Sequence, residues 1–171
     1  MPAPILVAYS TIYGSTAEAA EFMTQKLREV GRVVDLKPAR EVKNIEPYPA
    51  VILGAPLYMF RWHRDAHRFL DRYRKALESL PLAAFALGPF HNKEDELESA
   101  RSMFAKELAR HPWLKPAARE VFVGRFDPTL LRFPYSLIGP IRQMPASDER
   151  DWNAIAAWCE NLLQQPAFTR G

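Results

Sequence analysis

The stretch VAYSTIYGSTAEAA, residues 7–20, decides how the rest of the chain is interpreted. It continues an apolar run that starts at Ile5, and it ends in an Ala/Glu-rich sequence that is typical of a helix. Between the two, six of the eight residues from Tyr9 to Thr16 carry a hydroxyl, and Gly14 interrupts them. A strand, a hydroxyl-rich loop and a helix therefore follow one another, with no lysine, arginine or carboxylate before Glu18.

Length and composition favour one globular domain. The chain has 171 residues, of which 48% are hydrophobic and 25% charged, as is typical of soluble proteins. We interpret the N-terminus as a first strand, because no basic region precedes its apolar run as in a signal peptide. The single cysteine, Cys159, excludes an intramolecular disulfide. We expect a buried thiol in a cytoplasmic protein, either free in the cytoplasm or peripheral at the inner face of the membrane.

Apolar strands alternate with amphipathic helices along the chain. We expect strands over residues 4–9, 32–37, 50–55, 82–87 and 120–126, and helices over 15–30, 61–78, 93–110 and 148–164, with a short helix at 41–44. This order predicts an α/β fold: a doubly wound, five-stranded parallel sheet with helices on both faces, in a single domain over residues 1–171. Residues 124–145 are then an insertion after the fifth strand, and 166–171 a loose tail.

Ligands bind such sheets outside the carboxyl ends of the strands, which selects the loops 10–15, 56–61 and 88–92. The first loop precedes a helix N-terminus, where free N–H groups and the helix dipole attract anions. Hydroxyls add donors without adding charge, so the loop suits a single phosphate. The sequence lacks GxxxxGK, GxGxxG and carboxylates at the end of the first strand, which excludes a P-loop, a dinucleotide fingerprint and a receiver-type phosphorylation site. The structural alternative is a turn that only caps the helix.

The run from Ser10 to Thr16 resembles the FMN-phosphate loop of flavodoxins. The order of elements agrees with a flavodoxin-like fold over most of the chain. The resemblance implies that FMN is the cofactor. It also implies that the phosphate is contacted by Ser10, Thr11, Tyr13, Gly14, Ser15 and Thr16.

The second and third loops suit the flat, apolar ring of a flavin. The second, APLYMFRW at 55–62, is rich in aromatic residues; Tyr58 is our first candidate for stacking, with Phe60 and Trp62 as rivals. For Trp62 we favour packing beneath the loop. In flavodoxin-like folds the third loop brings backbone N–H groups to the pyrimidine edge, where His91 is either a donor or an ordinary surface histidine. The candidate ring contacts are Pro56, Leu57, Tyr58, Met59, Phe60, Gly88, Pro89, Phe90 and His91.

Three further segments carry a closer resemblance. They are GAPLYMFRWHRDAHRFLDRYRKAL (54–77), VFVGRFDPTLL (121–131) and SDERDWNAIAAW (147–158). They resemble the flavodoxin-domain group that includes the menaquinone-dependent protoporphyrinogen IX dehydrogenases. This implies an FMN-dependent oxidoreductase that passes electrons from a reduced substrate to a quinone or similar acceptor. Arg61 and Arg64 would then pair with substrate carboxylates; we assign no catalytic acid or base.

Other functions stay open beside this one. The main alternative is a non-catalytic electron-transfer flavodoxin that docks with a redox partner protein; an NAD(P)H:quinone reductase and a flavin-free scaffold are further alternatives. Basic residues near the second loop favour an enzyme, because electron-carrier flavodoxins are usually acidic around the flavin. The segment 124–145, with apolar residues flanked by arginines, fits a lid, a membrane contact or a packed connection equally.

We expect neither a nucleic-acid partner nor a metal site. His63 and His67 stand at i, i+4 on a helix, yet the sequence offers no third ligand near them. The sequence does not indicate the oligomeric state.

Overall fold

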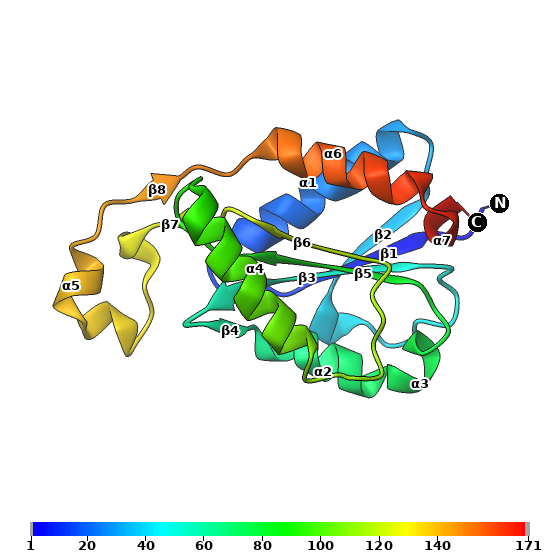
Figure 1. Cartoon of the computed structure of the whole chain (residues 1–171), viewed down its shortest axis with the longest axis horizontal. Coiled ribbons are helices and arrows are strands. Elements are labelled where there is room, and N and C mark those ends of the chain that lie inside the picture. Colours follow the sequence, from blue (N-terminus) through cyan, green and yellow to red (C-terminus); the bar gives the residue numbers. More distant parts are fainter. Residues whose placement is uncertain (1, 170–171) are drawn as a thin grey trace.

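A parallel sheet forms the centre of the protein, in a computed structural model that describes residues 2–169 (Figure 1). The strand order is β2-β1-β3-β5-β6. The bounds are β1 Ile5–Tyr9, β2 Val34–Pro38, β3 Val51–Tyr58, β5 Leu82–Leu87 and β6 Ala118–Phe122. All four pairings along this path are parallel. The predicted five-stranded, doubly wound sheet is therefore confirmed.

Helices cover both faces of the sheet (Figure 1). On one face lie α1 (Ser15–Glu29) and α6 (Trp152–Gln164). On the other lie α2 (Arg64–Arg72), α3 (Arg74–Leu77) and α4 (Glu94–Leu108). Side chains of a strand alternate between the two cores, because successive residues point to opposite faces: Val7 packs with the α1 side and Leu6 with the α2 side.

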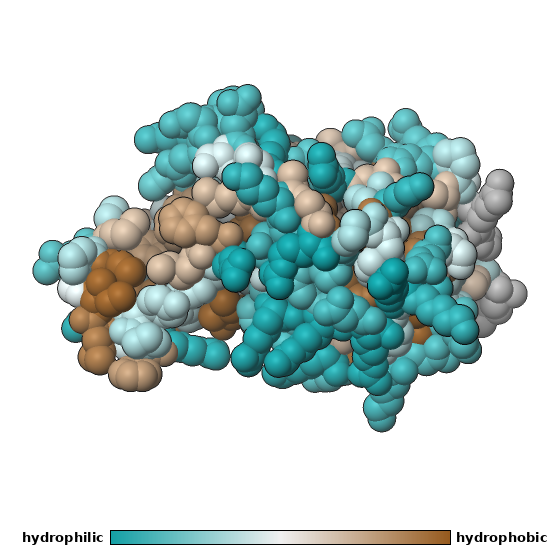
Figure 2. All heavy atoms as spheres, turned by 60° about the horizontal axis from the view of Figure 1, so that its bottom comes forward, coloured by the Kyte–Doolittle hydropathy of each residue, from teal (hydrophilic) through white to brown (hydrophobic). Residues whose placement is uncertain are grey.

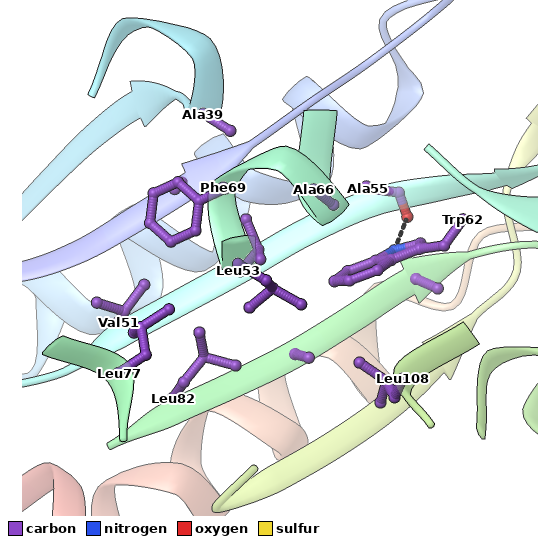
Figure 3. Close-up of a cluster of buried hydrophobic side chains, with 14 of the residues drawn as sticks. Ala39, Val51, Leu53, Ala55, Trp62, Ala66, Phe69, Leu77, Leu82 and Leu108 are labelled. Carbon is purple, nitrogen blue, oxygen red and sulfur yellow. Dashed lines mark hydrogen bonds between the residues drawn. The ribbon is translucent and has the colours of Figure 1, made fainter. Parts of the chain in front are cut away.

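Figure 3 shows the core on the α2 and α4 side, where Trp62 lies among Leu53, Phe69 and Leu108. Its indole N–H donates to the carbonyl of Ala55 at 3.1 Å. Trp62 is 2% exposed, so the expectation that it packs beneath the loop is confirmed. On the opposite face Cys159 is buried, as expected, and burial followed by the nearby Glu160 carboxylate raises its pKa to about 12.

One glycine is required by close packing inside the sheet. Gly54 in β3 faces Phe85 in β5, its parallel partner. A Cβ added to Gly54 would overlap the ring of Phe85. Any side chain at this position would therefore displace a fully buried ring.

The fifth strand ends earlier than the sequence predicts. A single strand over 120–126 is wrong: β6 stops at Phe122, and β7 (Arg125–Phe126) pairs antiparallel with β8 (Ser147–Asp148). Where the chain leaves the sheet, the N–H of Gly124 donates to the carbonyl of Pro89 in the third loop. Between β7 and β8 lie η2 (Pro128–Leu130), η3 (Tyr135–Leu137) and α5 (Gly139–Arg142). Figure 1 shows this segment projecting from the left end of the molecule.

Three other expectations are corrected. Residues 61–62 form β4, a short strand antiparallel to β3, and α2 begins only at Arg64. The short helix η1 lies at Ala39–Glu41 instead of 41–44. Residues Pro166–Thr169 form α7 and are no loose tail, because the apolar Phe168 packs into the α1 and α6 core; residues 170–171 of the expected tail lie outside the described part. No helix within residues 2–169 is long and apolar enough to cross a bilayer.

Candidate functional site

The first loop turns from β1 into α1 at a glycine with positive φ. Gly14 has φ +94°, a conformation that favours glycine. Its N–H donates to the Thr11 hydroxyl at 2.8 Å, which closes the loop on itself. Ser15 is the first helical residue. The first-turn amides of α1 have no partner within the helix, so this end attracts an anion.

Two hydroxyls at this helix end are buried without a partner. Ser10 is 6% and Thr16 0% exposed, and neither side-chain oxygen has a hydrogen-bond partner in the described protein. A buried, unpaired polar group costs about 1–3 kcal/mol. A phosphate monoester supplies the acceptors that these donors lack, so the loop fits the phosphate of FMN.

The other predicted phosphate residues lie in the same loop. The Thr11 hydroxyl holds the loop closed, and the Tyr13 hydroxyl lies 3.3 Å from that of Tyr58. Gly14 provides the turn and Ser15 begins the helix.

The second and third loops enclose a cavity of about 500 Å³. Six of the predicted ring contacts line it: Leu57, Met59, Phe60, Gly88, Pro89 and Phe90. Helix α4 completes the wall with Asp95, Glu96, Ser99, Ala100 and Met103. Sequence reasoning missed these five residues. The available signal was that α4 starts two residues after the third loop ends.

His91 pairs with a carboxylate of α4. Its Nδ1 is 3.1 Å from Glu96 Oε1, and its backbone N–H donates to Oε2 of the same carboxylate. His91 is absent from the cavity lining, whereas Glu96 belongs to it. Glu96 thus contacts both this histidine and the cavity.

A strained hairpin separates two sets of side chains. Met59 and Phe60, between β3 and β4, have φ of 49° and 66°, which is costly for residues with a Cβ and is often found at ligand clamps. Leu57 and Met59 line this apolar cavity. Tyr58 and Arg61 line a second cavity, which is rich in arginine and is described below. The hairpin thus forms a wall with a different chemistry on each side.

The segment from β7 to β8 contacts all three loops. Arg125 donates to the carbonyl of Tyr13 in the first loop at 3.0 Å. Tyr135 packs edge-on against Tyr58 in the second loop, with 5.3 Å between ring centroids. Phe126 packs on Phe90 in the third, at 4.7 Å. We call residues 125–148 the arm; its base is part of the site.

Comparison with known proteins agrees with this geometry. A family model described as the flavodoxin domain matches residues 6–149. The chain belongs to the flavodoxin-domain family. Flavodoxin domains bind FMN, so FMN is the cofactor, as the sequence predicted.

Individual relatives are distant. Protoporphyrinogen IX dehydrogenase [quinone] of Escherichia coli strain K12 is 23% identical over 131 residues, which cover 75% of this chain and 70% of that protein. A short-chain flavodoxin associated with a bacterial microcompartment superposes with a TM-score of 0.57 at 10% identity, covering 96% of this chain and 98% of that one. An archaeal flavodoxin gives 0.52 at 15% identity, covering 92% and 99%. At such identities the structures show a shared fold.

This flavodoxin domain has a second, basic cavity of about 500 Å³ beside the hairpin. It is lined by Ile12, Tyr58, Arg61, Trp62, His63, Arg64, His67, Arg68, Asp71 and Arg110. The predicted substrate residues Arg61 and Arg64 are both present. Their side chains are 70% and 77% exposed, and the nearest carboxylate oxygens lie 3.8 and 4.0 Å away. Such loose pairs contribute little stability, which leaves both guanidinium groups free to bind an anion.

A series of buried, hydrogen-bonded polar side chains borders this basic cavity. His67 Nε2 lies 2.8 Å from Glu107, and His67 Nδ1 lies 2.8 Å from His111 Nε2. Glu107 also accepts the backbone N–H of Trp62 at 3.1 Å. Burial alone would raise the pKa of Glu107, but hydrogen bonds from His67 and Trp62 outweigh it and lower the pKa. The ionised carboxylate thereby fixes β4.

The phenol of Tyr58 lines the basic cavity. Burial raises the pKa of Tyr58 far above its ordinary value, with the Tyr13 hydroxyl as second cause. Tyr58 thus stays protonated and can donate a hydrogen bond. Within the described residues, no cluster of three or more His, Cys, Asp or Glu side chains could hold a metal.

Proposed function

We propose that this protein is an FMN-dependent oxidoreductase acting on a reduced, carboxylate-bearing substrate of the protoporphyrinogen kind, with a quinone or similar acceptor. FMN, when bound, supplies the redox chemistry, and the protein positions it and excludes water. The single observation that carries this proposal is the arginine-lined cavity directly behind Tyr58, on the far side of the hairpin from the apolar cavity. An electron carrier that only docks with a protein has no need of such a cavity.

In this proposal the phosphate loop and the apolar cavity bind FMN, and the basic cavity lies next to the flavin ring. The hydroxyls of Ser10 and Thr16 and the first-turn amides of α1 would hold the FMN phosphate. The apolar walls at Met59 and Phe90 would enclose the flavin ring and keep water away from it. The ring and the basic cavity would then share the Tyr58 wall.

Arg61 and Arg64 would anchor the substrate. A guanidinium group binds a carboxylate with two parallel hydrogen bonds, which fixes orientation as well as affinity. Neither group has to give up a strong partner first, because their present ion pairs are long and exposed. The printed name of the Escherichia coli relative, a protoporphyrinogen IX dehydrogenase, agrees with an anionic, apolar substrate.

The arm suits contact with the membrane that holds a quinone. Its exposed apolar side chains include Phe133 at 78%, Leu137 at 70% and Ile138 at 40%. Figure 2 shows an apolar patch at the left end of the molecule, where the arm lies. Arg132 and Arg142 stand beside them, and both are exposed. Apolar side chains flanked by arginines favour a surface of anionic lipid.

The test is an anaerobic single-turnover reaction. FMN-loaded protein is mixed with protoporphyrinogen, and flavin absorbance is followed. We expect bleaching in the wild type and much slower bleaching in the Arg61→Gln/Arg64→Gln variant. The dimethyl ester of the substrate should reduce both proteins at a similar, slow rate. Arg28→Gln, remote from both cavities, is the control. Flavin that stays oxidised with protoporphyrinogen contradicts the proposal.

A second candidate is an electron-transfer flavodoxin that docks with a redox partner protein. The hairpin tip favours it, because Phe60 is 72% and Met59 51% exposed beside the apolar cavity. A redox titration separates the two. A carrier should take up its electrons in two well-separated one-electron steps, and the proposed oxidoreductase in a single two-electron step.

A further inference from the structure

Arg110 lines the basic cavity together with Arg61 and Arg64, but it is held differently from them. It stands two residues beyond the end of α4, and its backbone N–H donates to the carbonyl of Glu107 at 3.3 Å. Its guanidinium Nη1 donates to the carboxylate Oε2 of the same residue, also at 3.3 Å. Both the backbone and the side chain of Arg110 are therefore bonded to Glu107.

Glu107 is itself fixed by buried groups. It is 5% exposed, and its Oε2 also accepts the backbone N–H of Trp62 at 3.1 Å and lies 2.8 Å from Nε2 of His67. His67 in turn lies 2.8 Å from His111, and both imidazoles are buried. Exposed ion pairs hold their side chains weakly because both partners are mobile. Here one partner, the carboxylate, is immobilised within the protein.

The arginines that α2 contributes to the cavity have no such support. Arg64 Nε lies 4.0 Å and Arg68 Nη1 lies 3.7 Å from the same oxygen of Asp65. Their side chains are 77% and 71% exposed, against 50% for Arg110. A mobile side chain that is ordered on a ligand loses conformational entropy. Arg110 has lost part of this entropy before any ligand arrives.

The bond to Glu107 occupies only one corner of the guanidinium group of Arg110. Nη1 makes the contacts with Glu107 and His67, whereas Nε and Nη2 donate no hydrogen bond within residues 2–169. The N–H groups of Nε and Nη2 are parallel, so together they can bind both oxygens of one carboxylate. Arg110 can therefore bind a carboxylate in the cavity while it stays bonded to Glu107.

The alternative is that Arg110 serves only to keep Glu107 ionised. Burial is the largest influence on the pKa of Glu107 and would raise it. Hydrogen bonds from His67 and Trp62 lead the influences that lower this pKa, and the charge of Arg110 contributes least among them. Glu107 thus keeps its charge mainly through other groups, which favours a role of Arg110 toward a ligand.

We propose that Arg110 is a third carboxylate anchor of the basic cavity, beside Arg61 and Arg64, and that Glu107 is the positioning residue that holds it. Arg61 Nη1 lies 3.8 Å from the other oxygen of Glu107, so two of the three anchors border one carboxylate. This inference rests on the proposed function for the chemical class of the ligand. Both residues act on binding and orientation, and neither takes part in electron transfer.

Phthalate, an aromatic dicarboxylate that does not reduce FMN, is the probe. It is titrated into FMN-loaded, ¹⁵N-labelled protein, and the backbone amide signals around the cavity, including that of Trp62, report binding. Arg110→Gln should weaken phthalate binding about tenfold or more, the usual loss for a charged hydrogen bond. Arg68→Gln removes the same charge from the same cavity and should cost about threefold or less. Arg28→Gln, remote from both cavities, should change nothing.

A double-mutant cycle tests the positioning by Glu107. In a Glu107→Gln background, the loss caused by Arg110→Gln should fall to about that of Arg68→Gln, because the guanidinium group is no longer held. Arg110→Lys keeps the charge without the parallel donors, and it should lose nearly as much affinity as Arg110→Gln. Amide spectra show whether each variant is folded; if Glu107→Gln is not, Arg110→Lys decides the point.

The proposal is overturned if Arg110→Gln weakens phthalate binding no more than Arg68→Gln, if Arg110→Lys binds like the wild type, or if the wild type shows no saturable binding. An equal loss from Arg110→Gln in both backgrounds would overturn the role of Glu107. Phthalate binding involves no electron transfer. If protoporphyrinogen leaves the flavin oxidised while these losses occur, the proposed function fails and the anchor stands.

Discussion

The ring of Tyr135, in the arm, lies edge-on against the ring of Tyr58, at the end of β3, with 5.3 Å between centroids. The two residues are far apart in the sequence, and their contact brings the arm onto the hairpin that separates the two cavities. The arm thereby packs against the hairpin that forms one wall of the proposed flavin position.

Removal of that contact should open the site to water. We expect Tyr135→Ala to raise the quenching of bound flavin by iodide, because Tyr58 loses an aromatic neighbour that covers it. Tyr135→Phe keeps the ring and should behave as the wild type. Equal quenching in all three proteins would show that the arm does not cover the flavin.

We expect the unpartnered hydroxyls of Ser10 and Thr16 to contribute to FMN binding and not to the stability of the fold. We expect Ser10→Ala and Thr16→Val each to weaken FMN binding about tenfold, about 1–1.5 kcal/mol. The cofactor-free protein should be as stable as the wild type or slightly more so, because a buried unsatisfied group is removed.

Thr24→Val is the matched control for these hydroxyls. Thr24 is also in α1, 2% exposed, and its hydroxyl also lacks a partner in the described protein. It lies two turns further along the helix, so its replacement should leave FMN affinity unchanged. A loss of FMN affinity as large as that of Thr16→Val would contradict the assignment.

The buried histidine pair should make stability depend on pH. Burial, followed by the neighbouring His67, lowers the pKa of His111 below its ordinary 6.5. Below about pH 6.5 the unfolded chain gains a proton that the folded protein resists, so stability should fall as pH falls. The slope from this one group is at most about 1.4 kcal/mol per pH unit, and it ends when the pH reaches the folded pKa.

Urea unfolding of the cofactor-free protein at several pH values between about 7.5 and 5.5 measures this slope. His111→Gln should flatten it and lower stability at pH 7.5, because the partner nitrogen of His67 is lost. An unchanged slope in His111→Gln would show that another group is responsible.

The contact between Gly54 and Phe85 should be intolerant of any side chain. We expect Gly54→Ala to destabilise the protein by about 1–3 kcal/mol, the usual cost of overpacking a core. In a Phe85→Leu background, where the ring is gone, the same substitution should cost clearly less. Denaturant unfolding of the four proteins gives the interaction free energy; additive effects would show that the two residues do not interfere.

Local patterns predicted the sheet well. Apolar strands such as β3 and β5 are buried on both faces, and Gly14 with the surrounding hydroxyls marks the phosphate loop. The β3–β4 hairpin was not predicted, because Trp62 has the helical spacing of the apolar residues of α2. In the structure Trp62 belongs to β4 but packs in the same core as those residues. That residue's backbone is held by Glu107, a contact that only the folded chain brings together.

The site was predicted in part for the same reason. Loops that follow strands can be found from the sequence, and six ring-loop residues do line one cavity. The contact of Arg125 with the Tyr13 carbonyl was not predicted, because Arg125 reaches the first loop from a segment more than a hundred residues away. The sequence carries no local signal for such a contact. The sequence predicts that His91 lies in a loop, but it does not predict the contact with Glu96 that holds the imidazole.

The measurement that tests the proposed function most directly is a complete redox cycle of the FMN-loaded protein. Protoporphyrinogen is added without oxygen, followed by menaquinone, while flavin absorbance is recorded. We predict that the flavin bleaches with the first addition and recovers with the second, and that Arg61→Gln/Arg64→Gln slows the first step only. Flavin that dithionite reduces but protoporphyrinogen leaves oxidised would contradict it.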